Sequence, residues 1–89
     1  MKTIDYQFGK EFGLHARPAG VLANTASGFK SNITVIKSDG NRASARGIFA
    51  LLGLKIEGGN SIRVEVEGED EEAACEAIKN LFNNNFQNS

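Results

Sequence analysis

The chain has 89 residues, of which 40% are hydrophobic and 24% are charged, and its formal net charge at pH 7 is -1. This length suits a single domain over residues 1–89 with a modest core, which leaves little room for a large enclosed cofactor. Basic residues are scattered singly and no long apolar run occurs, so the composition argues against a nucleic-acid interface, a membrane span and a membrane-surface patch.

The first half of the chain alternates between strand and helix patterns. Apolar and polar residues alternate from Thr3 to Phe8, and a helical pattern runs from Pro18 to Gly28, a residue suited to a left-handed cap. We expect the helix to bury a stripe of Val21, Leu22, Thr25 and Ala26. In chain order the pattern predicts a strand over 3–8, a loop over 9–13, a helix over 18–28, a strand over 33–37, an Asp39-Gly40 turn and a short edge strand over 42–45.

The second half continues with helix, strand and helix. The apolar segment from Ile48 to Leu52 fits a short helix that Gly53 stops, and the alternation from Ile62 to Glu67 indicates a strand. A last helix has an acidic first turn and an apolar stripe of Ala74, Ala77, Ile78, Leu81 and Phe82. The tail that follows this helix is expected to fray beyond Phe86. The order β-α-β-β-α-β-α predicts an α+β, two-layer open-faced β-sandwich, in which three helices cover one face of a four-stranded, mainly antiparallel sheet.

One segment carries chemistry: Gly13-Leu14-His15-Ala16-Arg17-Pro18-Ala19. Proline is tolerated in a first helical turn, so His15 is expected near a helix N-terminus, where the N–H groups of Ala16 and Arg17 point outward. These groups favour neutral imidazole as the nucleophile and, with the Arg17 guanidinium, suit a bound phosphoryl group. The segment therefore predicts a phosphoryl-accepting histidine; on the residues alone, a structural or incidental histidine is the alternative.

This segment resembles the signature of the histidine-containing phosphocarrier family, HPr, of the bacterial phosphoenolpyruvate-dependent phosphotransferase system. The resemblance extends through Thr25-Ala26-Ser27, Asp39-Gly40, the segment 47–52 and the closing helix. It implies the open-faced β-sandwich fold and a carrier, not an enzyme, that Enzyme I phosphorylates at Nδ1 of His15, with Arg17 holding the phosphate. An Enzyme IIA domain would then receive the phosphoryl group, for sugar uptake or a regulatory branch.

The resemblance also implies a surface near His15 that binds partner proteins. A second helix this short cannot bury four large side chains on one face, so we expect one or two of them to be exposed and to contact partners. The expected docking residues are Gly20, Asn24, Ile48, Phe49 and Leu52. Transcriptional regulators are further candidate partners. We expect no cofactor, no metal and no nucleic acid, and a monomeric chain.

One position departs from the family pattern. In many Gram-positive members a regulatory serine opens the second helix, whereas this chain has Gly47 there and Ser44 as the nearest serine. Glycine can begin a helix but has no hydroxyl, so we predict no regulatory serine. The segment 48–52 and the end Leu81-Phe82-Asn83 also resemble the nitrogen-related branch of the family, and the sequence leaves both branches open.

Other residues have simple structural interpretations. Cys75 is expected as a small buried hydrophobic residue, and one cysteine with one histidine cannot form a Cys/His metal cluster. With no signal-peptide pattern, this cysteine usage indicates the cytoplasm. Gly58-Gly59 is expected as a turn, and Glu65 and Glu67 as solvated strand residues. A purely regulatory binding protein, or an enzyme with His15 as general base, is the alternative function, although no second catalytic group is evident near His15.

Overall fold

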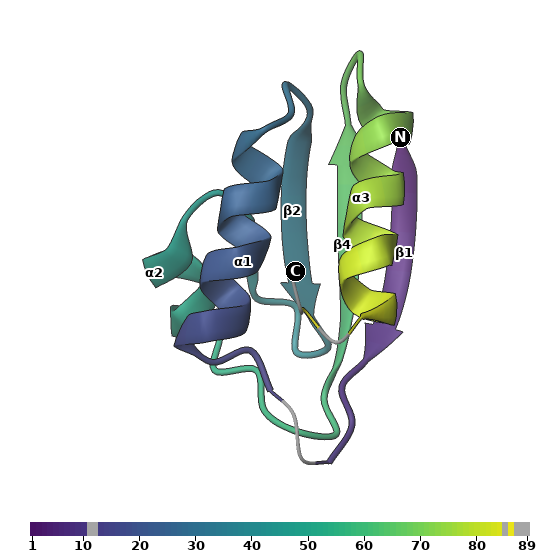
Figure 1. Ribbon diagram of the computed structural model, residues 1–89. Coiled ribbons are helices and arrows are strands. Elements are labelled where there is room, and N and C mark those ends of the chain that lie inside the picture. Colours follow the sequence, from purple (N-terminus) through teal and green to yellow (C-terminus); the bar gives the residue numbers. More distant parts are fainter. Residues whose placement is uncertain (11–12, 85, 87–89) are drawn as a thin grey trace.

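The computed structural model describes residues 1–10, 13–84 and 86. Within these residues, four strands form one antiparallel sheet in the order β1-β4-β2-β3, and the helices lie on one of its faces (Figure 1). The elements are β1 (Lys2–Gln7), α1 (Ala16–Ser27), β2 (Asn32–Lys37), β3 (Arg42–Ser44), α2 (Ile48–Gly53), β4 (Ser61–Glu67) and α3 (Glu71–Asn83). The predicted α+β class, the element order and the edge position of β3 are confirmed.

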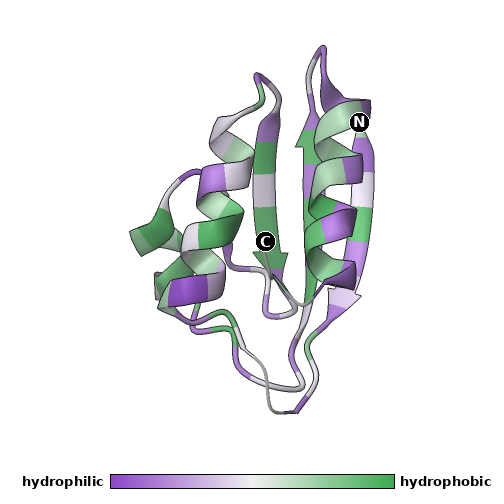
Figure 2. Cartoon of the chain, viewed as in Figure 1, coloured by the Kyte–Doolittle hydropathy of each residue, from purple (hydrophilic) through white to green (hydrophobic). Residues whose placement is uncertain are grey.

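Alternation along the strands separates a buried face of the sheet from an open one. Ile4 of β1 and Val35 of β2 both lie opposite Val64 of the central strand β4, and all three are buried. Apolar and polar bands alternate accordingly along the strands in Figure 2. On the open face, Arg63 Nε donates to Oδ1 of Asp5, directly opposite, at 2.9 Å. One face of the sheet therefore builds the core while the other carries mainly polar side chains.

Helix α1 differs from its prediction in its start and in its buried face. It begins at Ala16, two residues before Pro18, and its C-cap residue Gly28 has φ at -79°, so the predicted left-handed cap is wrong. Its buried residues are Ala19, Leu22, Ala23 and Ala26. The predicted Val21 and Thr25 are only half-buried. The alanines on the inner face let the helix backbone approach the core closely. Val21 and Thr25 then lie at the sides of the buried face of the helix.

The other two helices also correct details of the prediction. Gly53 does not stop α2 but forms its last residue, and the chain turns away only at Lys55, whose φ is 53°. Helix α3 buries Cys75 rather than Ala77, so the interpretation of Cys75 as a small core residue is confirmed. The fraying expected beyond Phe86 falls on residues outside the described ones. Within the described ranges, each helix is too short or too polar to span a bilayer.

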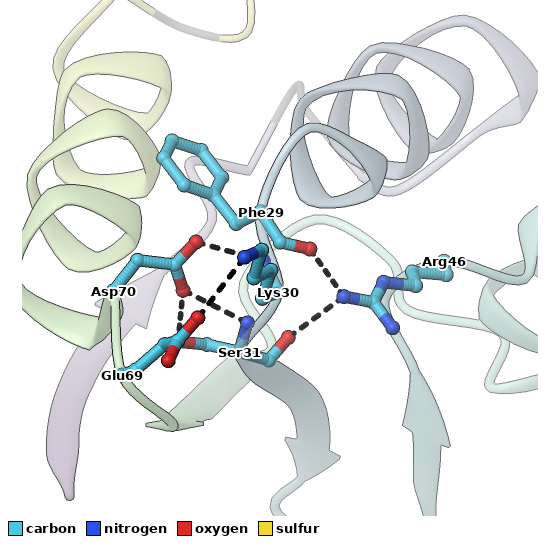
Figure 3. Close-up of polar contacts among 6 residues, drawn as sticks. All are labelled: Phe29, Lys30, Ser31, Arg46, Glu69 and Asp70. Atoms are coloured by element: carbon cyan, nitrogen blue, oxygen red, sulfur yellow. Dashed lines mark hydrogen bonds and ion pairs between the residues drawn. The ribbon is translucent and has the colours of Figure 1, made fainter.

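A polar cluster ties three segments together at the corner between α1 and β2 (Figure 3). The carboxylate of Asp70, just before α3, accepts hydrogen bonds from the N–H of Lys30 at 2.8 Å, the N–H of Ser31 at 2.9 Å and the Ser31 hydroxyl. Arg46, just before α2, donates to the carbonyls of Phe29 and Ser31. We call this cluster the Asp70 clamp. The Ser31 hydroxyl and the Lys30 N–H hold the pKa of the Asp70 carboxyl below its usual value.

Candidate functional site

His15 is the residue that immediately precedes α1, and its ring is exposed. Its backbone is extended, with φ at -85° and ψ at -176°, and its carbonyl accepts the N–H of Ala19 at 2.9 Å. Its side chain makes no capping hydrogen bond to the helix. The imidazole therefore lies at the amino end of the helix. Side chains at this position usually accept a hydrogen bond from the helix backbone, but neither ring nitrogen of His15 does so.

The first turn of α1 supplies hydrogen-bond donors beside His15. Ala16 and Arg17 have no carbonyl four residues earlier within the helix, Pro18 has no N–H, and the N–H of Ala19 is already bonded to His15. In the part of the chain that the structure describes, two backbone N–H groups are thus left for an anion, and no acidic residue lies in this turn to offset them. Arg17 is exposed and adds a guanidinium two residues from His15.

Gly13 lies close to the histidine ring, in a space that leaves no room for a side chain. A β-carbon on Gly13 would lie 2.9 Å from the carbonyl oxygen of Ile56 and 3.3 Å from Nε2 of His15. Only glycine fits at this position, because the distance from a β-carbon to the carbonyl oxygen of Ile56 would be shorter than a normal van der Waals contact. The geometry also shows that the Nε2 edge of the ring faces Gly13 and the segment beyond Ile56. Sequence reasoning assigned Gly13 only to a loop and missed this contact.

Hydrogen bonds fasten the segment before His15 to the segment before β4. Leu14 N–H donates to Ile56 O at 3.0 Å, Phe8 N–H to Asn60 O at 2.9 Å, and Gly59 N–H to Phe8 O at 3.1 Å. Gly58 packs so closely on this segment that a β-carbon there would lie 2.1 Å from the carbonyl oxygen of Lys10. The Gly58-Gly59 turn, predicted as a turn only, thus also fixes the position of the chain that leads to His15.

The five expected docking residues lie on α1 and α2, two helices that contact each other. Phe49 is 84% exposed, whereas Ile48 and Leu52 are half-buried and pack against the core. A β-carbon on Gly20 would lie 3.4 Å from Cδ1 of Ile48, so this glycine lies where the two helices pack together. Asn24 is exposed. The expectation that one or two large side chains of α2 are exposed is confirmed.

Comparison with known proteins decides the family. Residues 3–84 match the sequence profile described as the PTS HPr component phosphorylation site. The chain belongs to the HPr family. It is 40% identical over 76 residues to the phosphocarrier protein HPr of Xylella fastidiosa, covering 85% of this chain and 84% of that one. It is 38% identical over 85 residues to the HPr of Mycoplasma genitalium, covering 96% and 97%.

Solved structures of HPr proteins have the same fold. The HPr of Thermoanaerobacter tengcongensis superposes with a TM-score of 0.89 at 35% identity, covering 100% of this chain and 99% of that one. The HPr of Bacillus anthracis gives a TM-score of 0.77 at 34% identity, covering 86% and 90%. As an HPr, the chain is a phosphocarrier of the phosphotransferase system and not an enzyme.

Gly47 occupies the position at which the resemblance led us to look for a regulatory serine. Gly47 is the N-cap of α2, with an extended backbone and no side chain to cap the helix. Ser44 lies at the end of β3, where its hydroxyl accepts the N–H of Arg46 at 3.3 Å. The start of α2 therefore carries no hydroxyl that could be phosphorylated, and Ser44 lies outside that helix. The absence of a regulatory serine stays a prediction.

Proposed function

We propose that His15 accepts a phosphoryl group on Nδ1 from phosphorylated Enzyme I and donates it to an Enzyme IIA domain. The observation that carries this proposal is the exposed imidazole at the amino end of α1, which makes no capping hydrogen bond. The Nδ1 lone pair forms the bond to phosphorus while the bond between phosphorus and the donor breaks, and the donor keeps that electron pair. Such in-line transfer needs positioning and charge neutralisation rather than a further catalytic side chain.

The phosphoryl oxygens are proposed to bind the N–H groups of Ala16 and Arg17 and the Arg17 guanidinium. Backbone donors at a helix N-terminus face an anion together with the positive end of the helix dipole. The guanidinium fork adds charge-assisted hydrogen bonds that match the geometry of a phosphate. Partner proteins are proposed to dock on Gly20, Asn24, Ile48, Phe49 and Leu52. We place this relay in the cytoplasm, with the chain acting as a monomer.

The direct test is phosphorylation in vitro. The purified protein is incubated with Enzyme I and phosphoenolpyruvate, and mass spectrometry of the intact chain should show a single added phosphoryl group. Its linkage should be labile to acid and stable to alkali, as expected of a bond from phosphorus to an imidazole nitrogen. Peptide mapping under alkaline conditions should place it on residue 15. A serine-linked group, or one mapped to another peptide, would contradict the proposed site.

Arg17→Ala should slow phosphoryl acceptance without unfolding the protein. Loss of a charge-assisted hydrogen bond of about 1.5–3 kcal/mol corresponds to a rate about ten- to hundredfold lower. The fold should persist because Arg17 is exposed. Rapid-quench labelling measures the rate. The matched control is Arg63→Ala, which removes an exposed arginine from the open face of the sheet; an equal loss in both variants would argue for a general charge effect.

Phe49→Glu should weaken partner binding while leaving the melting temperature nearly unchanged. A side chain that is 84% exposed contributes little to the core, and an aromatic anchor at an interface is typically worth about 2 kcal/mol or more. The Kd for Enzyme I should therefore rise by at least about tenfold, as measured by calorimetry. Thr3→Glu introduces the same charge at an exposed residue of β1, on the open face of the sheet, as a control. An unfolded Phe49→Glu protein would show that Phe49 belongs to the core.

A further inference from the structure

We infer that Glu57 is a positioning residue for His15: its carboxylate accepts a hydrogen bond from Nε2–H of the imidazole and leaves the Nδ1 lone pair free for phosphorus. This inference rests on the proposed function, because it assigns a partner to the ring nitrogen that does not react. Glu57 lies 42 positions after His15 in the chain, so no local motif joins the two residues.

The contact around Gly13 brings Glu57 and His15 together. A β-carbon on Gly13 would lie 3.1 Å from Cα of Glu57 and 3.3 Å from Nε2 of His15. Both atoms lie close to the position that a Gly13 β-carbon would occupy. The distance between Glu57 Cα and His15 Nε2 therefore cannot exceed the sum of these two distances. A glutamate carries its carboxylate beyond two methylene groups, which is long enough to cross that gap. Of the two ring nitrogens, the structure thus places Nε2 next to Glu57.

The backbone of Glu57 is held in place on both sides. Its N–H donates to Oδ1 of Asn60 at 2.8 Å, and its carbonyl accepts the N–H of Asn60 at 3.0 Å. The preceding residue, Ile56, accepts the N–H of Leu14 at 3.0 Å, one residue before His15. These hydrogen bonds hold the segment that contains Glu57 against the residue before His15, so the fold sets the distance between the backbones of Glu57 and His15.

The Glu57 carboxylate is available for this role. Glu57 is exposed, and its side chain forms no ion pair with another residue in the described part of the chain. The carboxylate forms no hydrogen bond or ion pair with the ring in this structure, so the proposed contact requires rotation about the side-chain bonds of Glu57 toward Nε2. Among the residues that the structure describes, the other charged side chains in the segments around His15 and Glu57 are cationic: Arg17 on α1, Lys55 before Ile56, and Lys10, whose carbonyl lies against Gly58. Glu57 is therefore the described carboxylate placed to pair with the ring.

The chemistry explains what such a pairing does. Neutral imidazole carries one proton, and an acceptor at one nitrogen selects the tautomer with the proton on that nitrogen. With the proton on Nε2, the lone pair is on Nδ1. When Nδ1 forms its bond to phosphorus and the donor's bond breaks, the ring becomes positively charged and still holds its Nε2 proton. A carboxylate at Nε2 stabilises that charge more than it stabilises the neutral ring, so it favours phosphoryl acceptance.

The test compares Glu57→Ala, Glu57→Gln and the control Glu67→Ala, which removes an exposed glutamate at the far end of β4. Nitrogen-15 NMR of His15 in alkaline solution reports the tautomer of the neutral ring, and rapid-quench labelling with Enzyme I reports acceptance. In Glu57→Ala the Nε2–H tautomer should become less populated and acceptance should slow by about three- to tenfold. Glu57→Gln keeps an oxygen acceptor and should recover part of both effects, and Glu67→Ala should resemble wild type.

Two results would overturn the inference: an unchanged tautomer population in Glu57→Ala, or an unchanged acceptance rate. Failure of the proposed function has a different signature, because Enzyme I would then leave the wild-type chain itself unlabelled. The NMR measurement uses unphosphorylated protein, so in that case the tautomer population still decides whether Glu57 binds the ring.

Discussion

His15→Ala should abolish phosphorylation by Enzyme I. His15 is the only histidine in the chain, so the variant contains no imidazole that can form the bond to phosphorus. The donors of Ala16, Arg17 and the guanidinium remain in place, but they bind oxygens and do not attack phosphorus. Labelling with radioactive phosphoenolpyruvate should therefore fall to background, a larger effect than that of any variant that only weakens binding or positioning.

The same variant should remain folded, which makes the loss of labelling interpretable. The ring is exposed and makes no capping hydrogen bond, so its removal leaves neither a cavity nor an unpaired buried group. Circular dichroism and thermal melting should match wild type closely. A folded His15→Ala protein that still accepts a phosphoryl group would move the acceptor to another residue and end the proposal for His15.

Asp70→Ala should cause a large loss of stability although the residue lies away from His15. It removes the acceptor of three hydrogen bonds and leaves the hydroxyl and the N–H of the fully buried Ser31 without that partner. The corner between α1 and β2 then loses its attachment to the start of α3, whereas the bonds from Arg46 to Phe29 and Ser31 do not involve Asp70. For a domain of this size, we expect the melting temperature at pH 7 to fall by at least about 5 °C.

Acid should reduce the difference between wild type and Asp70→Ala. The pKa of Asp70 is lowered in the folded protein, so its stabilisation is present above the ordinary carboxyl value of about 4 and is lost as pH falls through the folded value. Glu71, whose pKa is lowered by the N-terminal amine and the Gly68 N–H, is present in both proteins and cancels in the comparison. A difference that stays constant down to pH 2 would contradict the role of the ionised carboxylate.

Glu69→Ala is the control for the clamp. Glu69 is the residue before Asp70, and its carboxylate pairs with Lys30 Nζ at 3.2 Å on the surface, where both side chains are exposed. Exposed ion pairs contribute little to stability. Glu69→Ala should therefore change the melting temperature far less than Asp70→Ala, although both variants remove one negative charge at the same end of α3.

Features that depend on neighbours in sequence were predictable. The alternation of Ile62, Val64 and Val66 with charged residues identified β4, because a strand with one open face must alternate. Alanine gives a weak hydrophobic signal, which is why the buried face of α1 was misassigned although the helix itself was found. The cap geometry of Gly28 depends on how the chain enters β2, and sequence alone does not specify this.

The same distinction applies to the site. His15 and Arg17 are two residues apart, so the motif brings them together before any folding is considered. The contact of Gly13 with Ile56 and Glu57, and the clamp between Ser31 and Asp70, join residues that are distant in the chain. No periodicity encodes such pairs. They follow from the sheet order, which places the segment before β4 beside the segment before α1 and the start of α3 beside the α1–β2 corner.

The uncovered side of the sheet has a practical consequence. Thr3 lies there, exposed on an outer strand, whereas the proposed docking residues belong to helices on the opposite side. A cysteine introduced at Thr3 would be the accessible thiol, because Cys75 is buried. A fluorophore attached to it would report the tumbling of the carrier as each partner binds and leaves, without occupying the surface proposed for their docking.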